Sequence, residues 1–245
     1  MHELNDLRLA VLIDADNIPY ANVKGIMEEI ARYGTPTFKR IYGDWTKPNL
    51  SGWKAVLLEN AITPIQQYGY TTGKNSTDSA MIIDAMDILY SGKADGFCIV
   101  SSDSDFTRLA IRLREAGMRV IGIGEKKTPN AFIVACEKFI YIEIISAALD
   151  KKEPKMETEM PSAQKSELIK IISTAINDLA EDDNGWVNLG AVGQLILKKK
   201  PDFDPRNYGY PKLSLLIKNL GVFEVDERMA ANRHHKSIYI RNKND

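Results

Sequence analysis

Short apolar runs alternate with helical patterns over residues 8–145, and this alternation constrains the fold more than any other feature. The first run, RLAVLID at 8–14, is apolar along almost its whole length, as in a strand buried on both faces. Further strand candidates lie at 38–44, 62–68, 96–102, 119–125 and 139–145, with helical patterns between them at about 23–30, 51–60, 77–91 and 104–116. This order predicts an α/β fold, a mainly parallel sheet between helices, in which ligands bind beyond the carboxyl ends of the strands.

The sequence divides into two domains joined by a linker. Residues 150–162 have no hydrophobic periodicity and contain two prolines and charges of both signs, so we expect a linker between a domain at 1–149 and a domain at 163–245. The second domain has three helical patterns followed by two strand-like segments, FEVDE and SIYIR. Three helices and a two-stranded hairpin in about 80 residues predict a small winged helix-turn-helix domain.

Composition, apolar runs and net charge exclude several classes of protein. The 245 residues are 44% hydrophobic and 27% charged, which excludes a disordered chain. We expect no membrane span, because no apolar run approaches the ~20 residues that a span needs, and no signal peptide, because the start MHELNDLRLA lacks an apolar h-region. Cys98 and Cys136 lie in apolar stretches, as in a protein of a reducing compartment, so we expect a cytoplasmic location. A net charge of −1 argues against a histone-like polyanion binder.

Aspartates gather where this fold places a ligand. Two predicted strands end in Asp-x-Asp, a further Asp opens a predicted helix, and Asp44 is a weaker candidate at the end of another strand. Any one of them has an ordinary explanation as a helix cap or a partner of a helix dipole, but that does not explain the whole set. Converging carboxylates repel unless a cation neutralises them, and all-oxygen ligands suit Mg²⁺ or Mn²⁺. The pattern therefore indicates metal-dependent phosphoryl chemistry at Asp14, Asp16, Asp78, Asp103 and Asp105.

These motifs also resemble a known family. IDADNI, GKNSTDSAMIIDAMD and SSDSDFTRLAIRLREAGMRVIGIG are similar to the NYN domain, in the LabA-like branch of the PIN-like nuclease superfamily, over about residues 8–145. The resemblance implies a PIN-like (Rossmann-like) fold and a metal-dependent endonuclease acting on RNA, with 5′-phosphate and 3′-hydroxyl products. It further implies that Asn17 orients Asp14 or a bound water. The implied metal ligands are Asp14, Asp78, Asp103 and Asp105, with Asp16 and Asp84 as second-tier candidates.

Two groups of side chains near this site have open roles. Asp84 matches a recurrent Asp of the family, but it lies six residues beyond Asp78 and points about 240° away on an ideal helix. A structural role is therefore expected for Asp84. Lys74 and Arg108, near loops at the carboxyl edge, are candidates for binding RNA phosphates, and the alternative is that they are solvated surface charges.

The second domain resembles the OST-HTH/LOTUS domain, a winged-helix module linked to RNA binding and to ribonucleoprotein partners. The most specific motif is Tyr-Gly-x-x-Lys-Leu-Ser-x-Leu-Ile at 208–217. The resemblance implies RNA as a partner, single-stranded or structured, and leaves room for a protein partner and for an oligomer. Lysines at the end of a helix also complement its dipole, which is the other reading of residues 198–200. The RNA-binding candidates are Lys199, Lys200, Tyr208, Lys212 and His235.

Two alternatives stay open at this point. A haloacid-dehalogenase-like phosphatase also begins with Asp-x-Asp after an apolar strand, but this chain has Ile18 where that family has Thr or Val, and Asp78 on a helix fits it poorly. The other alternative is a catalytically silent RNA-binding adaptor that has kept the nuclease fold.

Overall fold

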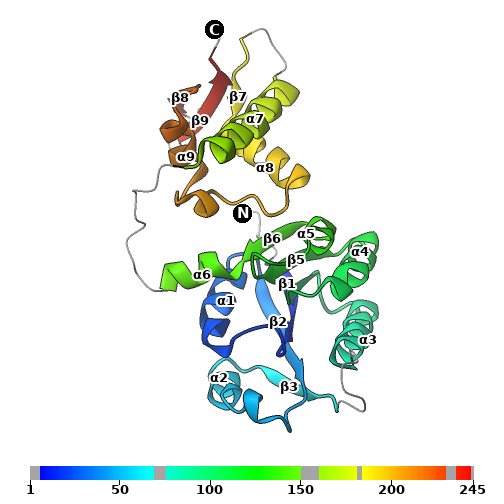
Figure 1. The fold of residues 1–245 in the computed structure, drawn as a ribbon. Coiled ribbons are helices and arrows are strands. Elements are labelled where there is room, and N and C mark those ends of the chain that lie inside the picture. The colour runs from blue at the N-terminus through cyan, green and yellow to red at the C-terminus, as the bar shows by residue number, and fades with distance from the viewer. Residues whose placement is uncertain (1–5, 69–75, 150–159, 181–183, 230–235, 244–245) are drawn as a thin grey trace. The chain divides into compact units, whose positions relative to one another are not determined.

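A computed structural model describes residues 6–68, 76–149, 160–180, 184–229 and 236–243. The chain folds into two compact units, Met1–Lys151 and Lys152–Asp245 (Figure 1). In the described residues, none of the helices has the length and apolar character needed to cross a membrane.

The first unit is built on a parallel sheet. Its strands are β1 (Arg8–Asp14), β2 (Thr35–Gly43), β3 (Thr63–Gln66), β4 (Gly96–Val100), β5 (Arg119–Gly124) and β6 (Lys138–Tyr141). They lie in the order β3-β2-β1-β4-β5-β6, and all neighbours are parallel. From β1 the chain adds β2 and then β3 on one side. It then crosses back and adds β4, β5 and β6 in turn on the other side. The strand order therefore reverses between β1 and β4, which is where a sheet of this type binds its ligand.

Helices cover both faces of this sheet (Figure 1). One face packs against α1 (Val23–Ile30), α2 (Trp53–Glu59) and α6 (Ile142–Leu149), and the other against α3 (Ser76–Ser91), α4 (Thr107–Glu115) and α5 (Asn130–Ala135). The burial of β1 on both faces explains why apolar and polar residues do not alternate in its sequence. Leu9, Val11 and Ile13 belong to one core cluster and Ala10 and Leu12 to the other, so every apolar residue of β1 is buried. The predicted α/β fold is confirmed.

One predicted strand is wrong in its second half. The run at 139–145 was expected to be a strand throughout, but β6 ends at Tyr141 and α6 begins at Ile142. Ile142 and Ile145 are three residues apart, and both belong to the core cluster that contains α1. An apolar run of this length fits a buried helix as well as a strand, and packing against α1 decides the outcome.

The second unit is a winged helix-turn-helix, as predicted. Its elements are α7 (Ser162–Leu179), β7 (Val187–Asn188), α8 (Leu189–Lys199), α9 (Leu213–Leu220), β8 (Phe223–Met229) and β9 (Lys236–Asn242). The antiparallel sheet has the order β7-β9-β8, so β7 is a short third strand that the sequence did not reveal. Ile172, Ile196, Leu216 and Ile240 join the helices and the sheet in one core.

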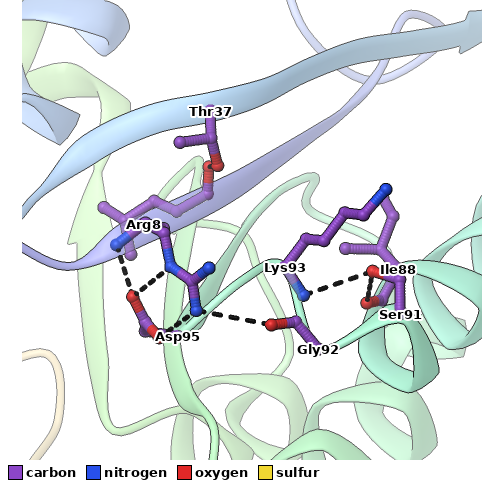
Figure 2. Close-up of polar contacts among 8 residues, drawn as sticks. Arg8, Thr37, Ile88, Ser91, Gly92, Lys93 and Asp95 are labelled. Atoms are coloured by element: carbon purple, nitrogen blue, oxygen red, sulfur yellow. Dashed lines mark hydrogen bonds and ion pairs between the residues drawn. The ribbon is translucent and has the colours of Figure 1, made fainter.

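At the amino ends of β1 and β4, Arg8 joins the two strands (Figure 2). The backbone N–H and Nε of Arg8 donate to Oδ2 of Asp95, at 2.9 and 3.0 Å, and its Nη2 donates to Oδ1 at 2.8 Å. Nη2 also donates to the carbonyl of Gly92, in the turn between α3 and β4. Charge-assisted bonds of this bidentate kind fix geometry as well as adding stability. They hold the β1–β4 pairing at the end opposite to the carboxyl edge.

The Arg8–Asp95 contact predicts a pH-dependent stability. Hydrogen bonds from Arg8 lower the pKa of Asp95 to about 2, so the contact stabilises the fold above the ordinary pKa of 3.8 and loses its effect as the pH falls toward 2. We expect Asp95→Asn to lower the melting temperature at pH 7, with a difference from wild type that narrows between pH 4 and pH 2. Circular dichroism melts measure this, with Glu59→Gln, an exposed side chain of α2, as control. A difference that does not change with pH would contradict the assignment.

Candidate active site

Asp14 is the buried anchor of the carboxyl edge. It ends β1 and is only 1% exposed, so its charge depends on hydrogen bonds rather than on water. Oδ2 accepts bonds from Nδ2 of Asn17 at 2.6 Å and from the Ser101 hydroxyl at 2.9 Å, and Oδ1 accepts one from the backbone N–H of Asp16 at 3.0 Å. Asn17 therefore contacts Asp14 directly, in the orienting position that the resemblance implied.

Ser101 connects the ends of β1 and β4. It is fully buried, its hydroxyl donates to Asp14, and its oxygen accepts the backbone N–H of Asp103 at 3.1 Å. Sequence reasoning missed this residue. The signal was the pairing of the strands: Ile13 lies opposite Val100, so the next residues along, Asp14 and Ser101, face each other at the point where the strand order reverses.

Three further aspartates form a close group. Asp78 lies in the first turn of α3, Asp103 caps the 3₁₀ helix Ser104–Phe106, and Asp105 lies within that helix, where its N–H donates to Asp103 Oδ1 at 2.9 Å. One carboxylate oxygen from each residue lies within 4.8 Å of the other two. Asp78 and Asp103 are half-buried and Asp105 is exposed, so the group is open to solvent. Three hard oxygen ligands from two segments of the chain suit a divalent cation.

The electrostatics of the edge favour cation binding. Burial and the charges of Asp14, Asp103, Asp105 and Asp16 raise the pKa of Asp78 to about 6. Burial also raises the pKa of Asp14, although the bonds from Asn17, Ser101 and Asp16 act in the opposite direction. Both raised pKa values mean that the ionised carboxylates are unfavourable, first because they are partly removed from water and then because of neighbouring negative charge. A cation bound at the edge would remove the cost.

Asp14 and Asp16 stand apart from the group of three. The resemblance implied four metal ligands including Asp14, whereas the close group in the described residues consists of Asp78, Asp103 and Asp105. Both oxygens of Asp14 accept bonds from protein donors. Asp16 is exposed, and its charge acts on Asp14 and Asp78. Asp44 lies elsewhere, in a turn where it accepts bonds from Thr46 and Gln66.

Asp84 joins α3 to the sheet. Its carboxylate accepts hydrogen bonds from Nη1 of Arg40 and from the hydroxyl of Tyr42, both on β2. This contact agrees with the structural role that the 240° separation from Asp78 suggested. It matters for the site, because the helix that Asp84 attaches to the sheet is the one that carries Asp78.

The proposed RNA-binding residues have different surroundings. Arg108 is exposed in the first turn of α4, close in sequence to Asp105. Lys199 pairs with Asp178 and Lys200 with Glu167, both on α7, and Tyr208 packs against the core of the second unit. Lys212 is exposed at the N-cap of α9. Lys74 and His235 lie outside the described residues.

The raised pKa of Asp78 predicts that its negative charge lowers the stability of the metal-free fold. Its pKa is about 6 in the fold against an ordinary 3.8, so between these pH values the folded protein binds more protons than the unfolded chain. The free energy of unfolding therefore falls as pH rises through 6. Asp78→Asn removes the charge and should stabilise the metal-free protein at pH 8 by about 1–2 kcal/mol, after allowance for solvent screening.

Urea unfolding in EDTA at pH 8 and at pH 4.5 measures this effect. The stabilisation should shrink at the lower pH, where Asp78 is already mostly protonated in the fold. Asp87→Asn, on an exposed position of the same helix, is the matched control. A variant no more stable than wild type at pH 8 would show that the carboxylates do not repel one another.

Two family models match the chain, one in each unit. Residues 8–143 match the NYN domain and residues 159–234 match the OST-HTH/LOTUS domain. No curated protein matches the chain. A protein of unknown function from Vibrio parahaemolyticus is similar to it in structure, with 18% identity over 58% of this chain and 96% of the other, and a TM-score of 0.49.

Two solution structures match a shorter stretch. An uncharacterized protein from Nitrosomonas europaea is 35% identical over 37% of this chain and 91% of its own, with a TM-score of 0.28. A fragment from Chromobacterium violaceum is 32% identical over 36% and 87%, also with a TM-score of 0.28. The NYN match covers more than half of the chain, and an NYN domain that has an acidic group and is followed in the sequence by a LOTUS domain fits a nuclease or RNA-binding role. The chain belongs to the NYN domain family.

Proposed function

We propose that this protein is a divalent-cation-dependent endoribonuclease that hydrolyses RNA phosphodiester bonds and leaves 5′-phosphate and 3′-hydroxyl ends. The observation that carries the proposal is the convergence of Asp78, Asp103 and Asp105 in an NYN domain, with carboxylate oxygens within 4.8 Å of one another. Two segments of the chain, the first turn of α3 and the turn that follows β4, bring like charges together there, at a cost that cation binding offsets.

The donor set fits Mg²⁺ or Mn²⁺. Asp78, Asp103 and Asp105 would hold the cation, and all three offer oxygen, the ligand atom that these hard ions prefer. When bound, such an ion supplies activation of water and stabilisation of the leaving oxygen. The haloacid-dehalogenase alternative loses its support, because the chain belongs to another family.

The other residues of the edge orient the carboxylate of Asp14 or bind the RNA. Asn17 and Ser101 hold the carboxylate of Asp14 in one orientation beside the group, where it adds negative charge and can accept a proton. Arg108 is exposed in the first turn of α4, where a guanidinium can bind an RNA phosphate. The free, buried thiols of Cys98 and Cys136 fit a reducing compartment such as the cytoplasm.

In this proposal each of the two domains has its own function. Residues 1–149 form the nuclease domain, 150–162 the linker and 163–245 the RNA-binding module, which also provides a surface for a protein partner. The match to the OST-HTH/LOTUS domain supports RNA binding by the second domain.

The test is a cleavage assay on end-labelled RNA and DNA, single- and double-stranded, with Mg²⁺, Mn²⁺ or EDTA. We expect RNA cleavage with either metal, none in EDTA, and a loss of at least about 100-fold in Asp103→Asn, since a metal ion contributes several kcal/mol to such reactions. Asp87→Asn, an exposed aspartate of α3, is the control and should cut at the wild-type rate.

RNA binding without cleavage under every metal condition would overturn the nuclease and support the adaptor. Cleavage that survives in EDTA, or in Asp103→Asn, would place the chemistry elsewhere in the chain.

Ser101 provides a separate test of the site's architecture. Ser101→Ala removes a buried donor to Asp14 and a buried acceptor for the N–H of Asp103, so we expect a loss of about 1–3 kcal/mol in the free energy of unfolding. Cleavage should fall about tenfold or more while RNA affinity in EDTA stays unchanged, because Ser101 does not face solvent. Ser104→Ala, one turn along and exposed, is the control for both measurements. An equal loss in both variants would show that Ser101 has no special role.

A further inference from the structure

Two aromatic residues of the second unit are not used in its core. Phe203 and Phe223 are buried in the core cluster, and Tyr208 and Tyr210 pack against it. Trp186 and Tyr239 belong to neither set in the described part of this unit. Both are half-buried, so part of each ring remains accessible to a ligand. Large aromatic side chains outside a core are typical of binding surfaces.

The position of these residues follows from strand alternation. On β8, Phe223 and Val225 face the core, so Glu224, Asp226 and Arg228 face the other side of the sheet. On β9, Ile240 faces the core and Tyr239 and Arg241 face outward. β9 is the central strand, and Tyr239 lies opposite both Asp226 of β8 and Asn188 of β7.

Planar cations stack on the two rings. Cζ of Arg228 lies 4.3 Å from the centre of the Tyr239 ring and 5.4 Å from that of Trp186, and Cζ of Arg241 lies 4.8 Å from the centre of Trp186. We call Trp186, Arg228, Tyr239 and Arg241 the Trp–Arg face. It is a continuous set of flat groups on one side of a sheet, and the side chains of Arg228 and Arg241 remain 45% and 32% exposed.

The charges of the Trp–Arg face are locally balanced. Arg228 pairs with Asp226 at 2.8 Å and Arg241 with Glu224 at 2.7 Å. Ion pairs this exposed are worth about 0–1 kcal/mol, so a ligand can exchange them at small cost. The Trp–Arg face therefore offers flat surfaces for stacking and planar hydrogen-bond donors. It has little net positive charge. This favours unpaired bases over the phosphates of a duplex, whose bases are stacked on one another and inaccessible.

We propose that the Trp–Arg face binds single-stranded RNA by stacking unpaired bases on Trp186, Tyr239 and the guanidinium planes of Arg228 and Arg241. The inference rests on the proposed function, in which this domain binds the RNA substrate, and it assigns the binding surface and the strandedness. Aromatic rings and arginine planes on an open sheet are a general means of holding unpaired bases. The N–H groups of the arginines reach base edges or phosphates once they leave their acidic partners.

The first experiment measures affinity in EDTA, where binding is separated from cleavage. The full chain is titrated into a fluorescein-labelled, unstructured 15-nucleotide RNA, followed by anisotropy, with the corresponding duplex as a second probe. We expect Trp186→Ala and Tyr239→Ala each to weaken single-strand binding by at least about fivefold. Arg228→Lys keeps the charge but removes the plane, and it should also weaken binding. Tyr90→Ala, an exposed tyrosine of α3, is the matched control.

A second measurement uses the unmodified protein and so does not depend on the folding of variants. RNA containing 4-thiouridine is irradiated in the complex, and the crosslinked peptides are mapped by mass spectrometry. Crosslinks to peptides that contain Trp186 or Tyr239 would support the proposal. Crosslinks confined to other segments, wild-type affinity in a folded Trp186→Ala variant, or equal affinity for the duplex would overturn it.

These outcomes are independent of the nuclease proposal. If Trp186→Ala loses RNA binding and wild type cuts nothing with Mg²⁺ or Mn²⁺, the Trp–Arg face stands and the nuclease fails. If wild type cuts RNA and Trp186→Ala binds as tightly as wild type, the nuclease stands and the Trp–Arg face fails.

Discussion

At the carboxyl ends of β1 and β4, the two strands between which the order of the sheet reverses, the buried Ser101 hydroxyl donates a hydrogen bond to Asp14. The same serine oxygen accepts the N–H of Asp103, so one buried hydroxyl binds the carboxylate of Asp14 and the backbone of Asp103, two residues far apart in the sequence. At the opposite end of these strands, Arg8 and Asp95 fix the same pairing. The acidic edge is thus held by contacts at both ends of β1 and β4, which keep mutually repelling charges in place.

Most of the first domain could be predicted because its central strands β1, β4 and β5 are buried on both faces. The run ending in Asp14 has no polar alternation, and the structure buries it between two layers of helices. The end of the sheet was harder to predict, because the apolar run with Ile142 and Ile145 fits a helix as well as a strand. Packing against α1 decides in favour of the helix. At the site, the aspartates could be found by residue type and spacing. Ser101 could not, because a serine carries no such signal until strand pairing places it opposite Asp14.

In the second domain, the proposed binding face could not be found from the charged residues of the sequence. Lys199 and Lys200 stand out in sequence, yet both pair with acids of α7, which became neighbours only through packing. Trp186, Arg228, Tyr239 and Arg241 are scattered over 56 positions and form no motif. Alternation along β8 and β9, together with the short strand β7, brings them onto one surface. That arrangement depends on tertiary structure, which a reading of local patterns does not supply.

The separation of Asp14 and Ser101 by 87 residues has a consequence for biosynthesis. β1 leaves the ribosome first, but one of its two partners, β4, is made only after α3 has been completed. Long-range parallel pairing is slow to form, since the entropy of closing a large loop must be overcome first. A nascent chain that ends before β4 therefore carries Asp14 without its partner strand. The complete acidic edge can assemble only once synthesis has passed Asp105, which delays the proposed hydrolytic activity until most of the domain exists.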